Sequence, residues 1–319
     1  MKILVVQLGR IGDMILATTM FSAIKNVYPE AEIYVLASGV NNSIIQNNPN
    51  VDKIYVLDKA PHKLLPLLLQ IRSNFFDYLI DPKDHRSTES SIIARLTGAK
   101  TKIGYNPPGK HYFDISNNNE KQNEGLHFVM RCYKPLLHLN ISMPRVIPRP
   151  ELYPTDASRN YVKEFLHKAN GRKVLVINIS ASYRAKMWDN DKWVGFIQAI
   201  DSGKFFPILS YAPSDRDVAE DLLAKVKIER FKSRSMDDVI AIIEKADILV
   251  TPDTSLVHVA AAFDKPLLGL FSGLDNFFDK FHPLSSVYEV VRSPKGMDGI
   301  KAIGIEDAID GFEHLLQKL

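Results

Sequence analysis

Residues 246–266, ADILVTPDTSLVHVAAAFDKP, combine polar side chains with an expected helix start in a way that suits an anion. The apolar run Ile248–Val250 predicts a short buried strand. Asp253, Thr254 and Ser255 are N-cap residue types, and the apolar residues after them predict a helix that opens on this turn. Backbone N–H groups and the positive end of the helix dipole meet at such a start, which favours a diphosphate. An ordinary capped turn of an α/β protein fits this segment equally well.

The segment Gln7–Asp13, QLGRIGD, places a carboxylate just after a predicted strand. Its two glycines allow a sharp turn, and Asp13 falls at or near the start of the next helix, at the carboxyl edge of the expected sheet. The spacing of Gly9 and Gly12 does not match the dinucleotide fingerprint, and the sequence has no Walker A loop. Asp13 is therefore a candidate general base or a helix cap, and the spacing alone favours the cap.

The segment Asn178–Trp193, NISASYRAKMWDNDKW, follows another predicted strand. Arg184 and Lys186 place cationic donors near the carboxyl end of that strand, where a phosphate could lie. The triplet Asp189-Asn190-Asp191 matches the short DxD pattern of metal-dependent sugar transferases, but capping of the following helix explains it more simply. The two tryptophans of this segment are expected in the core or at an interface.

Length and composition indicate an ordinary soluble protein of two domains. The chain has 319 residues, of which 45% are hydrophobic and 24% are charged. Its one cysteine, Cys132, cannot form an internal disulfide, and no His/Cys spacing suggests zinc, so a reducing cytoplasm fits best. No apolar stretch approaches the roughly 20 residues that span a bilayer, and the N-terminal segment lacks a signal-peptide pattern. We therefore expect a cytoplasmic protein.

Charge is distributed unevenly along the chain. Residues 1–150 carry 18 Lys and Arg against 12 Asp and Glu, a net +6, whereas residues 151–319 carry 22 against 25, a net −3. The basic half suits an anionic substrate or an anionic membrane leaflet, although scattered surface lysines would explain it as well. Nucleic acid is disfavoured, because the basic residues are not interleaved with aromatic residues that could stack on bases.

Strands and helices are predicted to alternate, as in a parallel sheet with crossover helices. The predicted strands are 2–7, 32–37, 51–57, 78–80, 173–178, 206–210, 247–250 and 267–271, and the predicted helices are 14–27, 64–73, 90–96, 126–137, 193–199, 216–225 and 236–245. The segment 140–154 contains four prolines and is the best candidate for a linker. The pattern predicts an α/β protein with two doubly wound, Rossmann-like domains, 1–150 and 151–319, facing across a cleft.

Four segments, in this order along nearly the whole chain, resemble the bacterial heptosyltransferases of glycosyltransferase family 9. They are QLGRIGDMILATTMFSAIKNVYP, LIDPKDHRSTESSIIARLTGAKTKIGY, SASYRAKMWDNDKW and TPDTSLVHVAAAFDKPLLGLF. The resemblance implies a GT-B glycosyltransferase fold with an N-terminal acceptor domain and a C-terminal donor domain. It also implies transfer of a heptose from a nucleotide-diphosphate donor, with ADP-heptose expected as substrate, to the inner core of lipopolysaccharide or a related anionic glycan. The transfer would invert the anomeric carbon and need neither a metal nor another cofactor.

The resemblance also implies roles for particular residues. Asp13 becomes the general base, and Lys186 contacts the donor phosphates. The donor-binding turn and helix start comprise Asp253, Thr254, Ser255 and His258. The acceptor-side candidates are Arg10, Gly12, Lys83 and Arg86.

Two other functions remain open at this point. A nucleotide-sugar epimerase could use the same scaffold and donor turn without an acceptor, and a non-catalytic protein could bind a nucleotide sugar. Pro213 stands where some heptosyltransferases carry an acidic residue that could hold the ribose, so the nucleotide is not fixed. Peripheral contact with the inner membrane is expected from the basic half, and neutralising Lys100 and Lys102 would be expected to weaken it.

Overall fold

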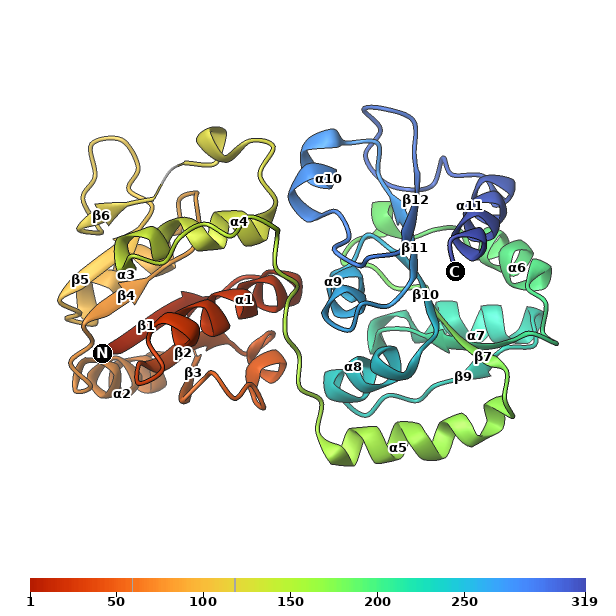
Figure 1. Cartoon of the computed structure of the whole chain (residues 1–319), viewed down its shortest axis with the longest axis horizontal. Helices are drawn as coiled ribbons and strands as arrows, with labels where there is room; N and C mark the ends of the chain where they lie inside the picture. The colour runs from red at the N-terminus through yellow and green to blue at the C-terminus, as the bar shows by residue number, and fades with distance from the viewer. Residues whose placement is uncertain (59, 118) are drawn as a thin grey trace. The chain divides into compact units, whose positions relative to one another are not determined.

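The computed structural model describes residues 1–58, 60–117 and 119–319, and shows two compact units (Figure 1). Lys59, one of the basic residues of the first half, and Asn118 lie outside the described residues. The first unit is Met1–Glu151 and the second is Leu152–Leu319. The division falls inside the proline-containing segment predicted as a linker.

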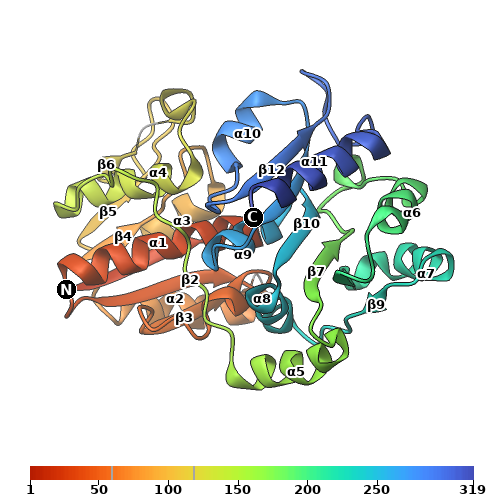
Figure 2. The same ribbon diagram turned by 45° about the vertical axis from the view of Figure 1, so that its right-hand side comes forward.

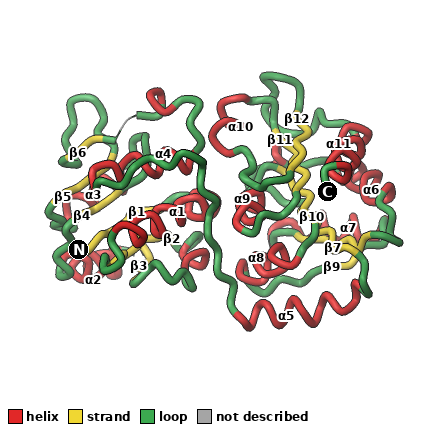
Figure 3. Tube along the Cα trace, viewed as in Figure 1, coloured by secondary structure: helices red, strands yellow, loops and turns green. Residues whose placement is uncertain are grey.

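The first unit contains a parallel sheet with the strand order β3-β2-β1-β4-β5-β6 among its described residues. Figure 3 shows its strands in yellow and its helices in red. The strands are β1 (Lys2–Gln7), β2 (Glu32–Ser38), β3 (Lys53–Leu57), β4 (Tyr78–Ile80), β5 (Thr101–Gly104) and β6 (Ile115–Ser116). The helices are α1 (Ile11–Val27), α2 (Pro61–Arg72), α3 (Thr88–Leu96) and α4 (Phe128–Tyr133), with 3-10 turns η1 (Asn42–Ile45), η2 (Lys121–Asn123) and η3 (Lys134–Leu139).

The strand order of this sheet reverses between β1 and β4. From β1 the chain moves outward through β2 and β3, and then returns to place β4 on the other side of β1, with Val5 opposite Ile80. Right-handed crossovers therefore put α1 on one face and α2 and α3 on the other, where they cover Leu4, Phe76 and Leu79. The crevice at the carboxyl ends of β1 and β4 is the topological switch point, where α/β sheets bind ligands.

The second unit repeats this architecture with the strand order β12-β11-β10-β7-β8-β9. Its strands are β7 (Lys173–Asn178), β8 (Phe205–Ser210), β9 (Glu229–Arg230), β10 (Ile248–Pro252), β11 (Leu267–Phe271) and β12 (Tyr288–Arg292). Its helices are α5 (Asp156–Leu166), α6 (Asn190–Ala199), α7 (Arg216–Lys225), α8 (Met236–Lys245), α9 (Ser255–Ala262), α10 (Asp275–Phe281) and α11 (Ile305–Gln317), with 3-10 turns η4 (His167–Ala169), η5 (Arg184–Lys186) and η6 (Pro213–Asp215). Figure 2 shows β7 beside β10, and this pair is the switch point of the second sheet.

The core of the second unit forms around the two tryptophans, as predicted. Trp188 and Trp193 are both buried, and their rings meet edge to face with centroids 5.0 Å apart. Trp193 and Phe196 continue this aromatic cluster to Phe312 of α11. The cluster anchors the chain directly after Lys186, so the position of that lysine depends on a well-packed core.

Both sheets and most of the predicted elements are observed, and the two-domain α/β architecture is confirmed. The elements that were not predicted are β5, β6, β9, β12, α5, α10 and α11. The predicted helix 126–137 is split, because α4 passes into the 3-10 turn η3 at Lys134, where Pro135 follows. Most of these differences lie in short elements or edge strands. The central strands of both sheets are observed as predicted.

Candidate active site

Two predicted site residues meet at the switch point of the second sheet. Lys186 follows β7 and Asp253 follows β10, and their side chains form an ion pair. Each of these side chains is 12% exposed. The Lys186 ammonium also lies 5.4 Å from the Tyr183 ring centroid and 5.9 Å from that of Phe277. The Lys186 ammonium is thus paired with one carboxylate and lies near two aromatic rings. An incoming phosphate could pair with this ammonium beside Asp253 or displace the Asp253 carboxylate from it.

The backbone around Lys186 is held by the loop after β12. The N–H of Ile300 donates to the carbonyl of Ala185 at 3.0 Å. Gly299 lies so close that an added Cβ would be 2.4 Å from the same carbonyl oxygen, and its φ of +89° also favours glycine. The indole N–H of Trp188 donates to the carbonyl of Ile303 at 3.0 Å. The backbone of Lys186 is therefore fixed, although the residue lies in the short 3-10 turn η5 between β7 and α6.

The turn between β10 and α9 is held by buried hydroxyl groups. The Asn178 amide donates to Thr251 Oγ1 at 2.9 Å, and Thr251 Oγ1 lies 3.1 Å from Thr254 Oγ1. Thr254 is the N-cap of α9, and its hydroxyl accepts the N–H of Leu256 at 3.2 Å. Of the three predicted N-cap candidates, Thr254 fills the position. The Asp253 carboxylate pairs with Lys186 instead of capping the helix, so a cation is held at the residue just before the N-cap of α9.

His258 lies in the second turn of α9 and is buried, with 5% of the residue exposed. Burial, with the nearby positive charges of Lys186 and His282, lowers the pKa of His258 to about 3. Its Nδ1 is buried with no hydrogen-bond partner among the described residues, and its ring packs 6.1 Å from that of Phe281. A neutral imidazole therefore lies beside the lysine, and it adds no competing positive charge.

The switch point of the first sheet holds Asp13. Its Oδ2 accepts the N–H of Arg10 at 3.1 Å, which is the bond expected of a residue near a helix start. Within the part of the chain that the structure describes, Oδ1 makes no hydrogen bond or ion pair. An added Cβ on Gly9 would lie 2.4 Å from Asp13 Oδ2, so only glycine leaves room for the carboxylate in this position. The cap and the base are compatible roles, because they use different oxygens.

Two side chains that the sequence analysis did not single out hold the loop in front of Asp13. Asn41 is fully buried and donates to the carbonyls of Gln7 and Gly9 at 3.0 and 2.9 Å. Gln7 Oε1 accepts the N–H of Gly9 at 3.2 Å. Only the tertiary structure shows this arrangement, because Asn41 is 28 residues beyond Asp13 in a loop after β2.

The acceptor-side candidates Lys83 and Arg86 lie in the loop after β4, and Arg10 and Gly12 lie at the start of α1, which follows the neighbouring strand β1. The N–H of Lys83 donates to Asp81 Oδ1 at 3.1 Å, and burial raises the pKa of the Asp81 carboxyl. Lys83 is half-buried, whereas Arg86 is exposed. The switch point thus gathers these candidates at one edge of the first sheet.

The same loop is anchored by a buried ion pair to α4. Asp84 Oδ2 accepts from Arg131 Nη1 at 2.9 Å and from the Asn123 amide at 3.1 Å, and both charged side chains are about 95% buried. Removing one partner would leave an uncompensated buried charge, which costs about 3–5 kcal/mol. The anchor therefore fixes the loop that carries Lys83 and Arg86.

The two aspartates of the DxD triplet form ion pairs at the start of α6, and its asparagine forms a hydrogen bond. Asp189 is the N-cap residue by position and lies 3.5 Å from the Lys301 ammonium, and Asp191 lies 3.4 Å from that of Lys225. The Asn190 amide donates to Asp221 at 2.7 Å. Among the residues that the structure describes, the Asp189 side chain makes no capping hydrogen bond, so ion pairs and the Asn190 hydrogen bond, rather than the predicted capping, account for the triplet.

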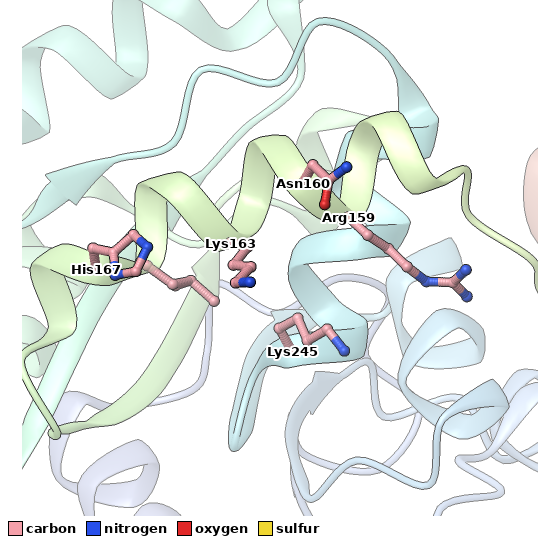
Figure 4. Close-up of a pocket in the computed structure, with 6 residues that line it drawn as sticks. Arg159, Asn160, Lys163, His167 and Lys245 are labelled. Atoms are coloured by element: carbon pink, nitrogen blue, oxygen red, sulfur yellow. The ribbon is translucent and has the colours of Figure 1, made fainter.

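A cationic hollow elsewhere in the second unit is separate from this site. It is lined by Arg159, Asn160, Lys163, Leu166, His167 and Lys245. Figure 4 shows these side chains along α5 and at the end of α8. Both helices end where the chain enters β7 and β10, at the amino edge of the sheet. Lys186 and α9 lie at the opposite, carboxyl edge, so the hollow does not contribute to the candidate site.

The fold and the two switch points define an α/β protein built from two Rossmann-like units. Comparison with known families then identifies it: residues 65–300 match glycosyltransferase family 9 (heptosyltransferase). The chain belongs to this family and is a glycosyltransferase. Within the described residues, no helix is both long and apolar enough to cross a membrane.

Similar proteins cover nearly the full length of the chain. Lipopolysaccharide heptosyltransferase 3 of Escherichia coli K12 is 26% identical, over 96% of this chain and 95% of that protein. The structure of E. coli ADP-heptose lps heptosyltransferase II superposes with a TM-score of 0.83 at 19% identity, over 100% of this chain and 99% of that one. The structure of E. coli heptosyltransferase WaaC with ADP gives a TM-score of 0.76 at 16% identity, with the same coverage. These structures share the GT-B fold with this chain.

Proposed function

We propose that this protein transfers a heptose from ADP-heptose to the inner core of lipopolysaccharide or a closely related anionic glycan. The proposal rests mainly on the ion pair between Lys186 and Asp253, which lies in the turn before α9 at the switch point of the second sheet. Two similar proteins support this choice of donor and acceptor. One is named a lipopolysaccharide heptosyltransferase, which supports the acceptor, and the structure of another contains ADP, which supports the donor.

The proposed chemistry is an inverting displacement. The acceptor hydroxyl loses its proton to Asp13, its oxygen bonds to the anomeric carbon, and the bond from that carbon to the β-phosphate oxygen of ADP breaks. Proton transfer to a positioned base contributes typically about 10²–10⁴ in rate. Asp13 is suited to this role because its Oδ2 is occupied by the Arg10 N–H, and this bond orients the carboxylate.

The leaving ADP gains negative charge as that bond breaks. Lys186 and the backbone N–H groups at the start of α9 would stabilise this charge. The carboxylate of Asp253 holds the lysine in place before the donor binds. Lys186 and the start of α9 would supply this stabilisation without a metal ion, and no further cofactor is part of the proposal.

In this proposal the first unit binds the acceptor and the second binds the donor. Arg10, Lys83 and Arg86 supply positive charge at the first switch point, which suits a phosphorylated glycan. We also place the protein in the cytoplasm, in peripheral contact with the inner membrane where its acceptor would lie.

One assay tests the function and separates it from the alternatives. The protein is incubated with ADP-heptose, with and without a heptose-deficient core glycolipid, and the sugar products are analysed by NMR. Heptose attached to the acceptor with inverted anomeric configuration is expected. A changed sugar still attached to ADP, formed without acceptor, would indicate an epimerase, and tight binding with no product would indicate a binding protein.

A further inference from the structure

The helices α2 and α3 expose an unusual amount of aliphatic surface on one face of the first unit. Leu65 and Leu69 of α2 are 63% and 60% exposed, and Ile92 and Leu96 of α3 are 51% and 42% exposed. Each pair has the i, i+4 spacing that places two side chains on the same side of a helix. The two helices are neighbours on the sheet. We call these four residues the α2–α3 surface.

The exposure is not a consequence of missing core contacts. Leu68 and Ile71 of α2, and Ile93 and Ala94 of α3, are buried and face the sheet. The helix α2, PHKLLPLLLQIR, is thus apolar on its outer side as well as its inner side. A surface helix of a monomeric protein normally carries polar residues on its outer side, so this arrangement indicates a contact surface.

The charges of α2 are entirely positive, whereas α3 carries one charge of each sign. The sequence of α2 contains Lys63, Arg72 and His62 and no acidic residue, and α3 has Glu89 in its first turn and Arg95 in its last. In the described part of the chain, neither Arg72 nor Arg95 has an ion-pair partner. Lys63 pairs with Asp58 at 2.7 Å. The surface therefore combines exposed aliphatic groups with uncompensated guanidinium groups, in the half of the chain that carries a net +6.

The end of α2 adds an exposed aromatic residue. Phe75 is 78% exposed and has a φ of +53°, a conformation that is unfavourable for a bulky side chain. Its neighbour Phe76 is fully buried in the core. The backbone therefore holds one phenylalanine in water at the end of the helix that exposes the two leucines.

From these observations we infer that the α2–α3 surface seats the protein on an anionic lipid bilayer. Exposed Leu and Phe side chains with Lys and Arg beside them are the composition of helices that lie in the membrane interface. The lack of acidic residues on α2 favours an anionic lipid surface over a protein surface of mixed charge. The inference deepens the proposed function, since it rests on an acceptor that is embedded in a membrane.

Lys100 and Lys102, which the sequence suggested for membrane contact, are less suitable. The ammonium of Lys100 lies 2.7 Å from Asp77, and that of Lys102 lies 3.6 Å from Asp114. Each charge is already compensated, so neither adds much attraction for lipid phosphate. This pair provides a matched control for the cations of α2.

The test is co-sedimentation of the full chain with phosphatidylcholine vesicles that contain or lack 40 mol% phosphatidylglycerol, at about 0.05 and 0.15 M salt. Leu65→Glu/Leu69→Glu should reduce binding to the anionic vesicles by at least about tenfold, because two exposed leucines that would enter the bilayer are lost. Arg72→Gln should reduce it by about fivefold and make it less sensitive to salt. Lys100→Gln/Lys102→Gln, and Leu137→Glu on the opposite face of the sheet, should bind like wild type.

A second measurement does not depend on loss of binding. Leu69→Trp places a fluorophore on the surface, and vesicles with brominated acyl chains should quench its emission, whereas Leu137→Trp should show no added quenching. Three results would each overturn the inference. The wild type could fail to bind the anionic vesicles, the double substitution could leave binding unchanged, or the protein could form a dimer in solution that this substitution separates. Vesicle binding needs neither donor nor acceptor, whereas heptose transfer can be measured on a soluble core oligosaccharide without detergent or membrane. The two assays can therefore fail independently of each other.

Discussion

Lowering the pH should destabilise the second unit through His258. The pKa of this buried histidine is about 3 in the folded protein, against an ordinary value of 6.5. At pH 5 the unfolded chain binds a proton that the folded chain excludes, so stability is intact above about pH 6.5 and falls as the pH decreases. Between the ordinary pKa and pH 5 there are about 1.5 pH units, each worth about 1.36 kcal/mol, so we expect a loss of about 2 kcal/mol.

Both tryptophans lie in the second unit, so their fluorescence reports the unfolding of the domain that contains His258. Urea unfolding of wild type and His258→Gln is compared at pH 8 and pH 5. The free energy of unfolding of wild type should fall by about 2 kcal/mol more than that of the variant. His314→Gln, which removes an exposed histidine, should behave like wild type. Equal losses in wild type and His258→Gln would refute the assignment of a buried, neutral imidazole.

Three further outcomes are expected at the candidate site. Asp13→Asn should lower the rate of transfer by about 10²–10⁴ while ADP binding, measured by titration calorimetry, is retained; undiminished turnover would remove Asp13 from the mechanism. Gly9→Ala should displace the Asp13 carboxylate and lower the rate of transfer, whereas Gly39→Ala, which meets no atom within 4 Å, should not; equal activity of the two variants would contradict the role of the tight loop. Transfer should survive EDTA, and activity that is lost with EDTA and restored by Mn²⁺ would return attention to Asp189 and Asp191.

The central strands were predictable because their signal is local. The run KILVVQ is almost entirely buried as β1, and such a run between turn residues predicts a central parallel strand. The helices Arg216–Lys225 and Met236–Lys245 were predicted with the observed bounds, since their apolar residues repeat at helical spacing.

The elements that were missed had weaker signals, with two exceptions. The strand β12 is an edge strand of half-buried residues, and β6 has two residues, so neither shows a distinct apolar pattern. One exception is α5, which follows the N-cap residue Thr155. The other is α11, in which Ala308, Phe312 and Leu315 have helical spacing and are buried. This pattern was present in the sequence and predicts the helix that completes the aromatic core.

The residues of the candidate site were predictable individually, but their contacts were not. Spacing placed Lys186 and Asp253 each after a strand, and only the strand order makes β7 and β10 neighbours. The partner of Asp253 was also unexpected, since its carboxylate pairs with Lys186 and leaves the cap to Thr254. Likewise, nothing near Gln7 in the sequence indicates that the Asn41 amide donates a hydrogen bond to the Gln7 carbonyl.

The account depends most on the anion site formed by Lys186 and the start of α9. Titration calorimetry of ADP into wild type and Lys186→Gln tests it directly, with Lys192→Gln, whose lysine contacts the carbonyls of Lys301 and Ile303, as a matched control. Loss of a charge-assisted contact to a phosphate should weaken ADP binding by about tenfold or more in Lys186→Gln alone. Equal affinity of ADP for wild type and Lys186→Gln would contradict the placement of the donor at this site.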